Sequence, residues 1–167
     1  MAARNELKAV LEPADQVLVI TRVFDAPRDL VFKLWTDSKH AIKWWGPRDY
    51  PATYLDMDAR LGGAWRGCLT STETGKDLWQ GGIFREILPP ERLVFTFAWD
   101  EEGERGLETE VAITFAEQDG KTVMTFRHAP FQSIKERDGH QGGWTSTFDR
   151  LADYVRKLGS EEWPHSK

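Results

Sequence analysis

Few side chains in this sequence have the types and spacing needed for chemistry. The four histidines, His40, His128, His140 and His165, are far apart, and the single cysteine, Cys68, has no partner for a disulfide or a thiolate metal cluster. The sequence has no HExxH or CxxC pattern and no glycine-rich phosphate loop that leads into a helix. We therefore expect no metal site and no cofactor.

The best polar candidates for a functional role are His128, Glu86 and Arg66. His128 ends an apolar strand segment and shares a strand face with Met124 and Phe126. An imidazole on that face could exchange a proton inside an apolar cavity. We assign no catalytic residue, and His128 is the candidate for that role. The alternative is a hydrogen-bonded structural histidine. Glu86 and Arg66 fall on neighbouring strands and are expected to pair with each other.

The elements that would position these residues begin with a strand and two short helices. The β-branched segment VLVITRVF (17–24) predicts the strand. The first helix is expected to have Asp25 as its cap and Pro27 in its first turn. The second is expected to begin with Ser38 as its cap and to end at the Gly46 break, so that it carries the pair of tryptophans that precedes this glycine.

From residue 53 to residue 131 the hydrophobic pattern alternates with period two. Six apolar segments are separated by short runs of turn formers, which predicts six antiparallel strands. A long helix is predicted after them, with Ser133 and Glu136 in the spacing of a capping box. The apolar stripe of this helix consists of Trp144, Phe148, Leu151, Ala152 and Val155.

This order of elements predicts an α+β fold in which the long C-terminal helix covers a seven-stranded curved antiparallel sheet. We expect one domain at 17–158, with polar tails at 1–16 and 159–167. The net charge of −5, with both signs mixed along the chain, argues against nucleic-acid binding. Neither a signal peptide nor a membrane span is recognisable, and we expect a cytoplasmic protein.

Five motifs along the chain resemble the START-like, helix-grip (SRPBCC) superfamily, in the branch named for the activator of the heat-shock-chaperone ATPase. The motifs, in order, are FDAPRDLVFKLWTD, WWGP, LGGAW, GIFREILPPERLVFTFAW and GHQGGWTSTFDRLADYV. The resemblance runs from Val17 to Lys157 and is typical of bacterial single-domain members. It implies a START/Bet v-like fold in which the sheet wraps around the terminal helix and leaves a hydrophobic cavity between them, open near the two short helices. Members of this superfamily have many functions, so the fold alone does not define the function.

The side chains available to line such a cavity are mostly aromatic. The pocket that we predict consists of Trp45, Trp65, Trp79, Phe84, Phe95, Phe97, Phe115, Met124, Phe126, His128, Trp144 and Phe148. For each of them the alternative is that the side chain simply fills the core.

Two local patterns bear on the cavity. Neighbouring residues on a helix point about 100° apart, so Trp45 is expected to pack inward and Trp44 to lie nearer the rim; alternatively, both anchor the short helices on the sheet. Gly139, Gly142 and Gly143 weaken the front of the long helix by about 1 kcal/mol each relative to alanine. They indicate a close approach to another element or a gate at the pocket, with local looseness as the alternative.

Three functions are compatible with these patterns. The expected one is the binding of a small hydrophobic or aromatic ligand, which suits a pocket rich in aromatic residues and poor in catalytic groups. The alternatives are an enzyme of the cyclase or aromatase kind that uses His128 as an acid or base, and a co-chaperone-type interaction module, which only the resemblance to the heat-shock ATPase activator family implies. A small apolar or aromatic ligand is therefore the expected partner, with a homodimer and a chaperone partner left open.

Overall fold

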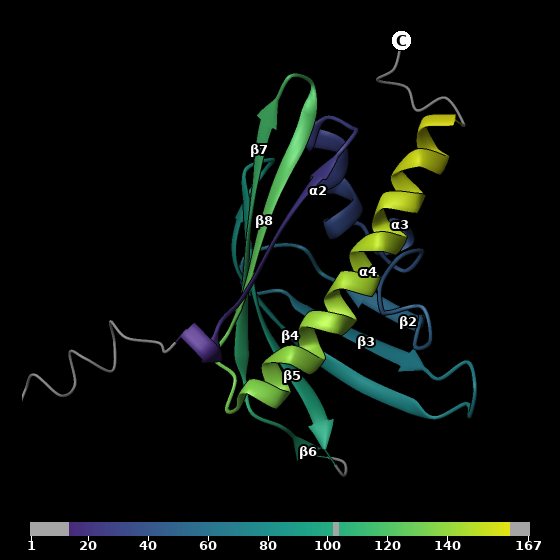
Figure 1. The fold of residues 1–167 in the computed structure, drawn as a ribbon, viewed down its shortest axis with the longest axis vertical. Coiled ribbons are helices and arrows are strands. Elements are labelled where there is room, and N and C mark those ends of the chain that lie inside the picture. The colour runs from purple at the N-terminus through teal and green to yellow at the C-terminus, as the bar shows by residue number, and fades with distance from the viewer. Residues whose placement is uncertain (1–13, 102–103, 161–167) are drawn as a thin grey trace, which may run out of the picture.

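In the computed structural model, a long C-terminal helix lies across one face of a curved antiparallel sheet (Figure 1). The structure describes residues 14–101 and 104–160, so most of the two predicted tails, 1–13 and 161–167, lies outside the described residues. The elements in chain order are η1 (Ala14–Gln16), β1 (Leu18–Phe24), α2 (Arg28–Thr36), α3 (Ser38–Ala41), β2 (Ala52–Met57), β3 (Ala64–Thr70), β4 (Asp77–Leu88), β5 (Arg92–Glu101), β6 (Glu104–Arg105), β7 (Thr109–Gln118), β8 (Lys121–Ala129) and α4 (Ile134–Ser160).

The strands form one sheet in the order β1-β8-β7-β5-β4-β3-β2, and each of these neighbours pairs antiparallel. The predicted α+β helix-grip fold with its curved antiparallel sheet is confirmed. The structure adds β6, a two-residue strand that pairs with β5 off this path. It is too short to show an alternating pattern, and it lies in a segment whose glycines and acidic residues predict only a turn.

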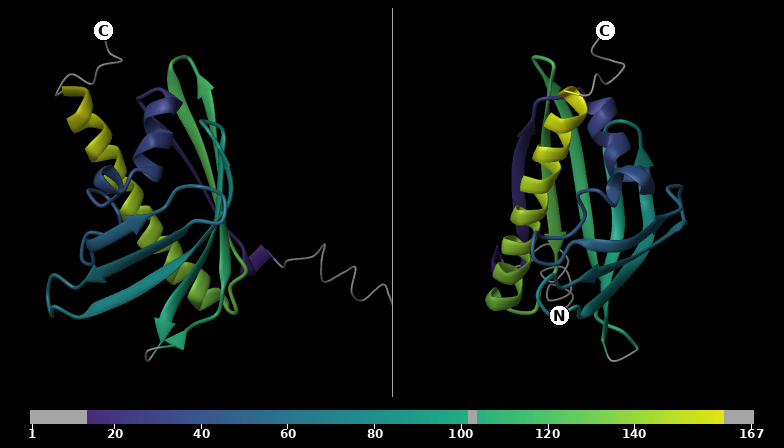
Figure 2. Two further views of the ribbon diagram at one scale, coloured as in Figure 1. Left: turned by 180° about the vertical axis from the view of Figure 1, so that it is seen from behind. Right: turned by 90° about the vertical axis from the view of Figure 1, so that its right-hand side faces the viewer.

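The sheet bends sharply because its long central strands change direction. Strands β2, β3 and part of β4 run at a steep angle to β1, β7 and β8, and α4 lies in the angle between them (Figure 2). The pairing of β4 with β5 shifts register between Phe84 and Glu86, as at a β-bulge. At Gly82 a Cβ atom would lie only 1.8 Å from the carbonyl oxygen of Thr96, so the bend requires glycine at this position.

The two short helices are present, but their caps differ from the prediction, and α3 ends at Ala41 rather than at the Gly46 break, so it does not carry the tryptophan pair. The cap of α2 is Pro27, which makes no side-chain cap bond, so Asp25 is not the cap. Asp37 caps α3 by accepting a bond from a backbone N–H of the first turn at 3.0 Å. Ser38 is the first residue of α3, and its hydroxyl accepts a bond from the backbone N–H of Met57 at 2.8 Å instead. Ser38 therefore links α3 to β2.

The long helix α4 follows its prediction closely. Ser133 caps it, because its hydroxyl accepts the backbone N–H of Glu136 at 3.0 Å. The carboxylate of Glu136 reaches back to the backbone N–H of Gln132 at 2.8 Å. The predicted stripe faces the core: Trp144, Phe148, Leu151 and Val155 are buried, and Ala152 packs against them. None of the helices in the described ranges is long and apolar enough to cross a membrane.

Part of the predicted N-terminal tail is attached to the domain. The backbone N–H of Phe131 donates to the carbonyl of Gln16 at 2.9 Å, and the Arg137 guanidinium donates to the carbonyl of Ala14 at 3.1 Å. At the other end α4 continues to Ser160, beyond the predicted domain boundary at 158.

The core is one continuous cluster in which tryptophan is prominent. Trp35 lies at its centre, with ring centroids 4.8 Å from Trp44 and 6.0 Å from Phe148, and its indole N–H is buried without a partner among the described residues. Trp44 is fully buried and donates to the carbonyl of Leu34 at 3.1 Å. The prediction that Trp44 lies near the rim is therefore wrong. It anchors the segment after α3 on α2.

Candidate ligand-binding site

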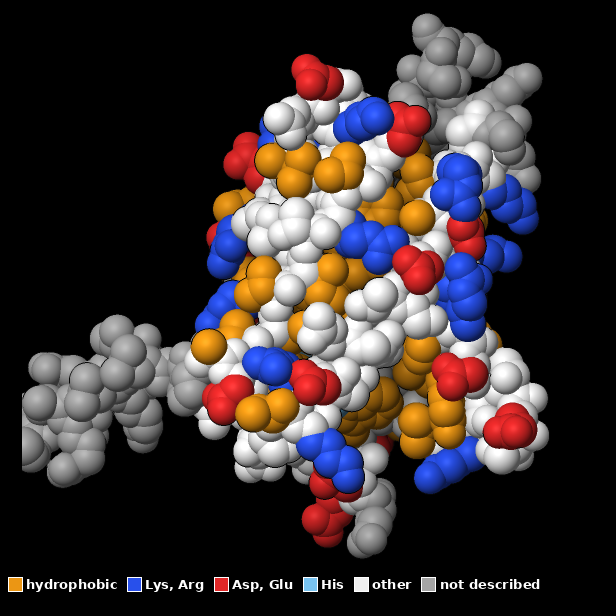
Figure 3. Space-filling view, viewed as in Figure 1, with side chains coloured by type: hydrophobic (Ala, Val, Ile, Leu, Met, Phe, Trp, Pro, Cys, Tyr) orange, Lys and Arg blue, Asp and Glu red, His pale blue; other side chains and the backbone are white. Residues whose placement is uncertain are grey.

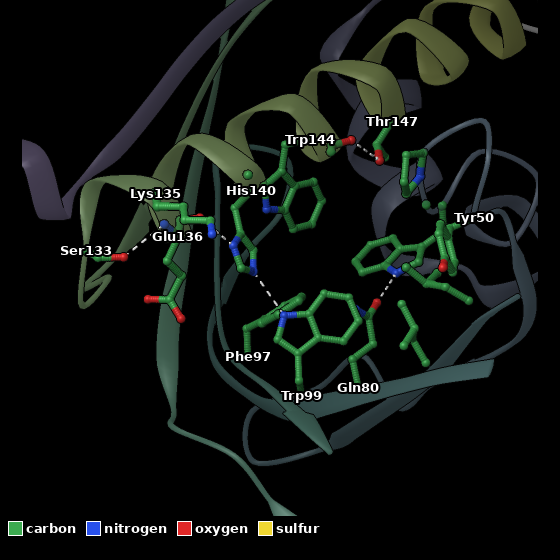
Figure 4. A pocket seen from close by; sticks show the side chains of 17 residues that line it. Tyr50, Gln80, Phe97, Trp99, Ser133, Lys135, Glu136, His140, Trp144 and Thr147 are labelled. Atoms are coloured by element: carbon green, nitrogen blue, oxygen red, sulfur yellow. Dashed lines mark hydrogen bonds between the residues drawn. The ribbon is translucent and has the colours of Figure 1, made fainter. Parts of the chain in front are cut away.

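A cavity of about 540 Å³ lies between the first half of α4 and strands β3, β4 and β5. The space-filling view shows hydrophobic side chains gathered in a hollow beneath this part of α4 (Figure 3). The residues that line it are Trp45, Gly46, Pro47, Tyr50, Leu69, Leu78, Gln80, Phe97, Trp99, Ser133, Lys135, Glu136, Gly139, His140, Gly143, Trp144 and Thr147 (Figure 4).

Burial distinguishes the floor of this cavity from its rim. Trp45, Gln80, Phe97 and Trp144 are buried and form the floor, together with other buried lining residues. The rim consists of the exposed first turns of α4 and the partly exposed side chains at the ends of β4 and β5. The loop after α3 supplies one wall. The cavity therefore reaches from solvent into the aromatic core.

Gln80 is the polar side chain that the sheet contributes to the floor of the cavity. It is 2% exposed, and its Oε1 accepts a hydrogen bond from the indole N–H of Trp45 at 2.7 Å. No described residue accepts a bond from its amide nitrogen. The sequence analysis predicts that Trp79, the neighbour of Gln80 in β4, lies in the pocket. Because neighbouring residues of a strand point to opposite faces, that prediction excludes Gln80 from the pocket.

His140 is the imidazole on the cavity wall. Its Nε2 accepts the indole N–H of Trp99 at 3.0 Å, and its Nδ1 lies 3.0 Å from the carbonyl oxygen of Glu136 (Figure 4). Because Nε2 is an acceptor here, the proton of the neutral ring is on Nδ1, and this N–H group donates a hydrogen bond to the backbone carbonyl oxygen of Glu136. This contact joins α4 to β5 beside the cavity.

His128, the predicted acid or base, lies behind the wall rather than on it. The indole N–H of Trp144 donates to its Nδ1 at 3.1 Å, so Nε2 carries the proton and donates to Thr109 Oγ1 at 2.7 Å. The hydroxyl of Thr109 donates onward to the carbonyl of Phe97 at 3.0 Å. Burial lowers the pKa of His128 well below the usual 6.5, and the nearby His140 lowers it further. His128 is a neutral, fully hydrogen-bonded residue of the core.

The structure divides the twelve predicted pocket residues into three groups. Trp45, Phe97 and Trp144 line the cavity. Eight are buried in the core and do not line it: Trp65, Phe84, Phe95, Phe115, Met124, Phe126, His128 and Phe148. Trp79 is 37% exposed, with the guanidinium of Arg66 5.0 Å from its ring centroid. The sequence showed which side chains turn inward but not which part of the interior is filled.

The predicted pair of Glu86 with Arg66 does not form. The guanidinium of Arg66 donates to the carboxylate of Asp100 at 3.1 Å, and Glu86 accepts from Arg92 at 3.0 Å. The register of β3 and β4 places Arg66 opposite Gly81, which leaves Glu86 nearer the turn to β5. Both ion pairs are surface pairs, so neither belongs to the cavity.

The three glycines in the first half of α4 do not mark a close approach to another element. A Cβ atom added at Gly139, Gly142 or Gly143 would meet nothing within 4 Å. Gly139 and Gly143 line the cavity, and Gly142 does not. The absence of side chains on this part of α4 therefore keeps the cavity wide.

Sequence reasoning missed several lining residues, and two signals could have identified the most important ones. Leu78 and Gln80 alternate with Trp79, so the three cannot share a face. His140 lies one helical turn before Trp144 on the apolar stripe. Among residues 14–101 and 104–160, no group of three or more His, Cys, Asp or Glu side chains could hold a metal ion.

A curved antiparallel sheet that grips a C-terminal helix around an interior cavity is the architecture of the helix-grip (SRPBCC) superfamily. The family described as activator of Hsp90 ATPase homolog 1-like protein matches residues 25–156, and the chain belongs to this family. No curated protein matches the sequence.

Solved structures with this fold come from several bacteria. The AHSA1 protein of Silicibacter pomeroyi is 26% identical, with a TM-score of 0.76 over 87% of this chain and 99% of the other. A protein of Chromobacterium violaceum is 25% identical, with a TM-score of 0.77 over 84% and 96%. A protein of Arthrobacter aurescens is 21% identical, with a TM-score of 0.77 over 86% and 87%, which shows the shared fold alone.

Proposed function

We propose that the protein binds a small hydrophobic or aromatic ligand in the cavity between its sheet and the first half of α4. The observation that carries this proposal is the cavity itself, about 540 Å³ in volume, with the rings of Trp45, Phe97, Trp99 and Trp144 among its walls. Small-molecule sites typically measure about 300 to 1,000 Å³ and combine apolar walls with a few orienting polar groups. This cavity fits both criteria.

The aromatic walls are already held in place. Three lining indoles each donate their N–H group to a polar side chain, and the pairs are Trp45 with Gln80, Trp99 with His140 and Trp144 with His128. These bonds satisfy the indole nitrogens and leave ring surface free to contact a ligand. Because the rings need little reordering, a ligand loses less free energy to ordering its site.

The geometry of the rings favours flat ligands. Trp45 and Trp144 have centroids 5.7 Å apart and planes inclined by 84°. Stacked and edge-to-face contacts with such rings contribute about 0.5 to 1.5 kcal/mol per pair beyond the burial of apolar area. A ligand with an extended aromatic face therefore gains more from these walls than a flexible alkyl chain of equal area.

The test is to fill the cavity from the helix side. Gly143→Leu projects a side chain from a lining position with open space around it, whereas Gly142→Leu adds the same side chain at a neighbouring position that does not line the cavity. Binding of the neutral fluorophore N-phenylnaphthylamine should weaken about tenfold or more in the Gly143 variant, corresponding to about 1.4 kcal/mol, and stay unchanged in the control. Equal affinities in the two variants would contradict the proposal.

A further inference from the structure

We infer that the ligand is a neutral aromatic compound that carries a carbonyl oxygen, and that the side-chain amide of Gln80 donates a hydrogen bond to this oxygen at the floor of the cavity. The inference rests on the proposed function and specifies its ligand class. It follows from the orientation of one buried amide and from the bonds already made by the polar groups around it.

The orientation of the Gln80 amide is fixed by its neighbour. The indole nitrogen of Trp45 can only donate, so the Gln80 atom at 2.7 Å from it must be the oxygen Oε1. The NH₂ group then occupies the other branch of the amide. No described residue accepts a bond from it, although the side chain is 2% exposed.

The open volume beside Gln80 explains how this NH₂ group is tolerated. Among the described residues, Trp35 Nε1 is the side-chain nitrogen or oxygen that is fully enclosed and has no partner, so Gln80 Nε2 retains contact with open space. Gln80 lines the cavity, and the cavity supplies that space. Its two N–H hydrogens are therefore available to whatever occupies the floor.

Other polar hydrogens at the floor are already committed. The indole N–H groups of Trp45 and Trp144 donate to Gln80 and His128, and the hydroxyl of Thr147 donates to the carbonyl of Gly143 at 2.8 Å. A ligand that reaches the floor thus meets aromatic faces and one free pair of donors. Its complement is an aromatic body with an acceptor oxygen.

The neutral charge of the amide selects among acceptors. A carboxylate at this depth would lose its hydration without meeting a cation, because the lysine that lines the cavity, Lys135, is on the exposed rim. A ketone or ester oxygen accepts the same bond without that loss. A hydrocarbon of the same shape would leave the NH₂ group without any partner, so it should bind about tenfold more weakly or worse.

The experiment compares two ligands of the same shape. Methyl naphthyl ketone and isopropylnaphthalene, substituted at the same ring position, compete with N-phenylnaphthylamine for the unmodified protein, for Gln80→Met and for the control Gln118→Met, the same substitution at an exposed position of β7 that does not line the cavity. We expect the ketone to bind about tenfold or more tightly than the hydrocarbon in the unmodified protein and in the control. In Gln80→Met the ratio should fall close to one.

Each other outcome is decisive. Equal affinities for ketone and hydrocarbon in the unmodified protein would overturn the ligand class while leaving the proposed function in place. A preference that persists in Gln80→Met would overturn the role of Gln80. If neither naphthalene compound nor the fluorophore binds the unmodified protein, the proposed function fails together with this inference. Because the first comparison needs no substitution, it stays decisive even if Gln80→Met does not fold.

Discussion

The protein should lose stability on mild acidification, and replacing His128 by glutamine should abolish much of that loss. His128 is fully buried, and its Nδ1 accepts the indole N–H of Trp144. If Nδ1 were protonated, its N–H group would face the indole N–H of Trp144 in an apolar environment, and neither donor would have an acceptor. Burial, assisted by the nearby His140, therefore lowers the pKa of His128 in the folded protein well below the usual 6.5.

The sign and size of the effect follow from this difference in pKa. Below about pH 6.5 the unfolded chain binds a proton at this histidine and the folded protein does not. The contribution of His128 to stability is thus fully present above its pKa in the unfolded chain. It is lost as the pH falls toward its pKa in the folded protein. Within that window one histidine changes the free energy of unfolding by about 1.4 kcal/mol per pH unit, and from about pH 7.5 to about pH 5.5 by about 1.4 kcal/mol in total.

Equilibrium urea unfolding at a series of pH values measures this directly. Glutamine keeps one donor and one acceptor but cannot titrate, so His128→Gln should be less stable at neutral pH and less sensitive to acid by about 1.4 kcal/mol over that interval. Thr122→Val, which removes a buried hydroxyl that cannot titrate, is the control and should lower the stability without altering its pH dependence. If the His128 variant and the unmodified protein show the same pH dependence, His128 is not the buried neutral residue described above.

Three further predictions concern stability. Phe148 is fully buried against Trp35 and Trp144, so Phe148→Ala should lower the free energy of unfolding by about 3 to 5 kcal/mol; an unchanged urea midpoint would mean that α4 is not docked as described. Gly142→Ala should raise the free energy of unfolding by about 0.5 to 1 kcal/mol, because the added methyl group meets nothing within 4 Å, and a loss of stability would contradict this. The hydrogen bond from Arg66 lowers the pKa of Asp100 in the folded protein. The stabilisation from this pair is therefore present above the ordinary aspartate pKa and is lost as the pH falls through the pKa of Asp100 in the folded protein. Asp100→Asn should make the stability less dependent on pH in the acid range, and an unchanged dependence would count against this pairing.

The order of elements could be predicted because each pattern had one solution. The stripe from Trp144 to Val155 suits a single helix face, and strands joined by short turns must pair antiparallel. Helix caps were less certain, since Asp25, Asp37 and Ser38 all have suitable side chains within a short segment. The choice depends on the backbone path into each helix, and a sequence pattern does not contain that path.

The cavity could be predicted only in part for a different physical reason. Hydrophobic periodicity identifies residues that point inward, but Phe126 on β8 and Trp144 on α4 both do so, and only Trp144 borders the cavity. The difference depends on how closely α4 approaches the sheet at each turn. Gln80 was missed because the large aromatic ring of Trp79 was assigned to the inner face of β4, and strand alternation then places Gln80 on the outer face.

The tryptophans that pack around Trp35 also give this protein a spectroscopic signature of its own. Trp35 and Trp45 have ring centroids 5.8 Å apart, and Trp45 lies 5.4 Å from Trp65 and 5.7 Å from Trp144. Indoles this close, held at fixed angles, couple their electronic transitions and should give circular dichroism bands of exciton type. Since Trp45 and Trp144 also form cavity wall, an occupant would change these bands, and the unlabelled protein reports its own occupancy.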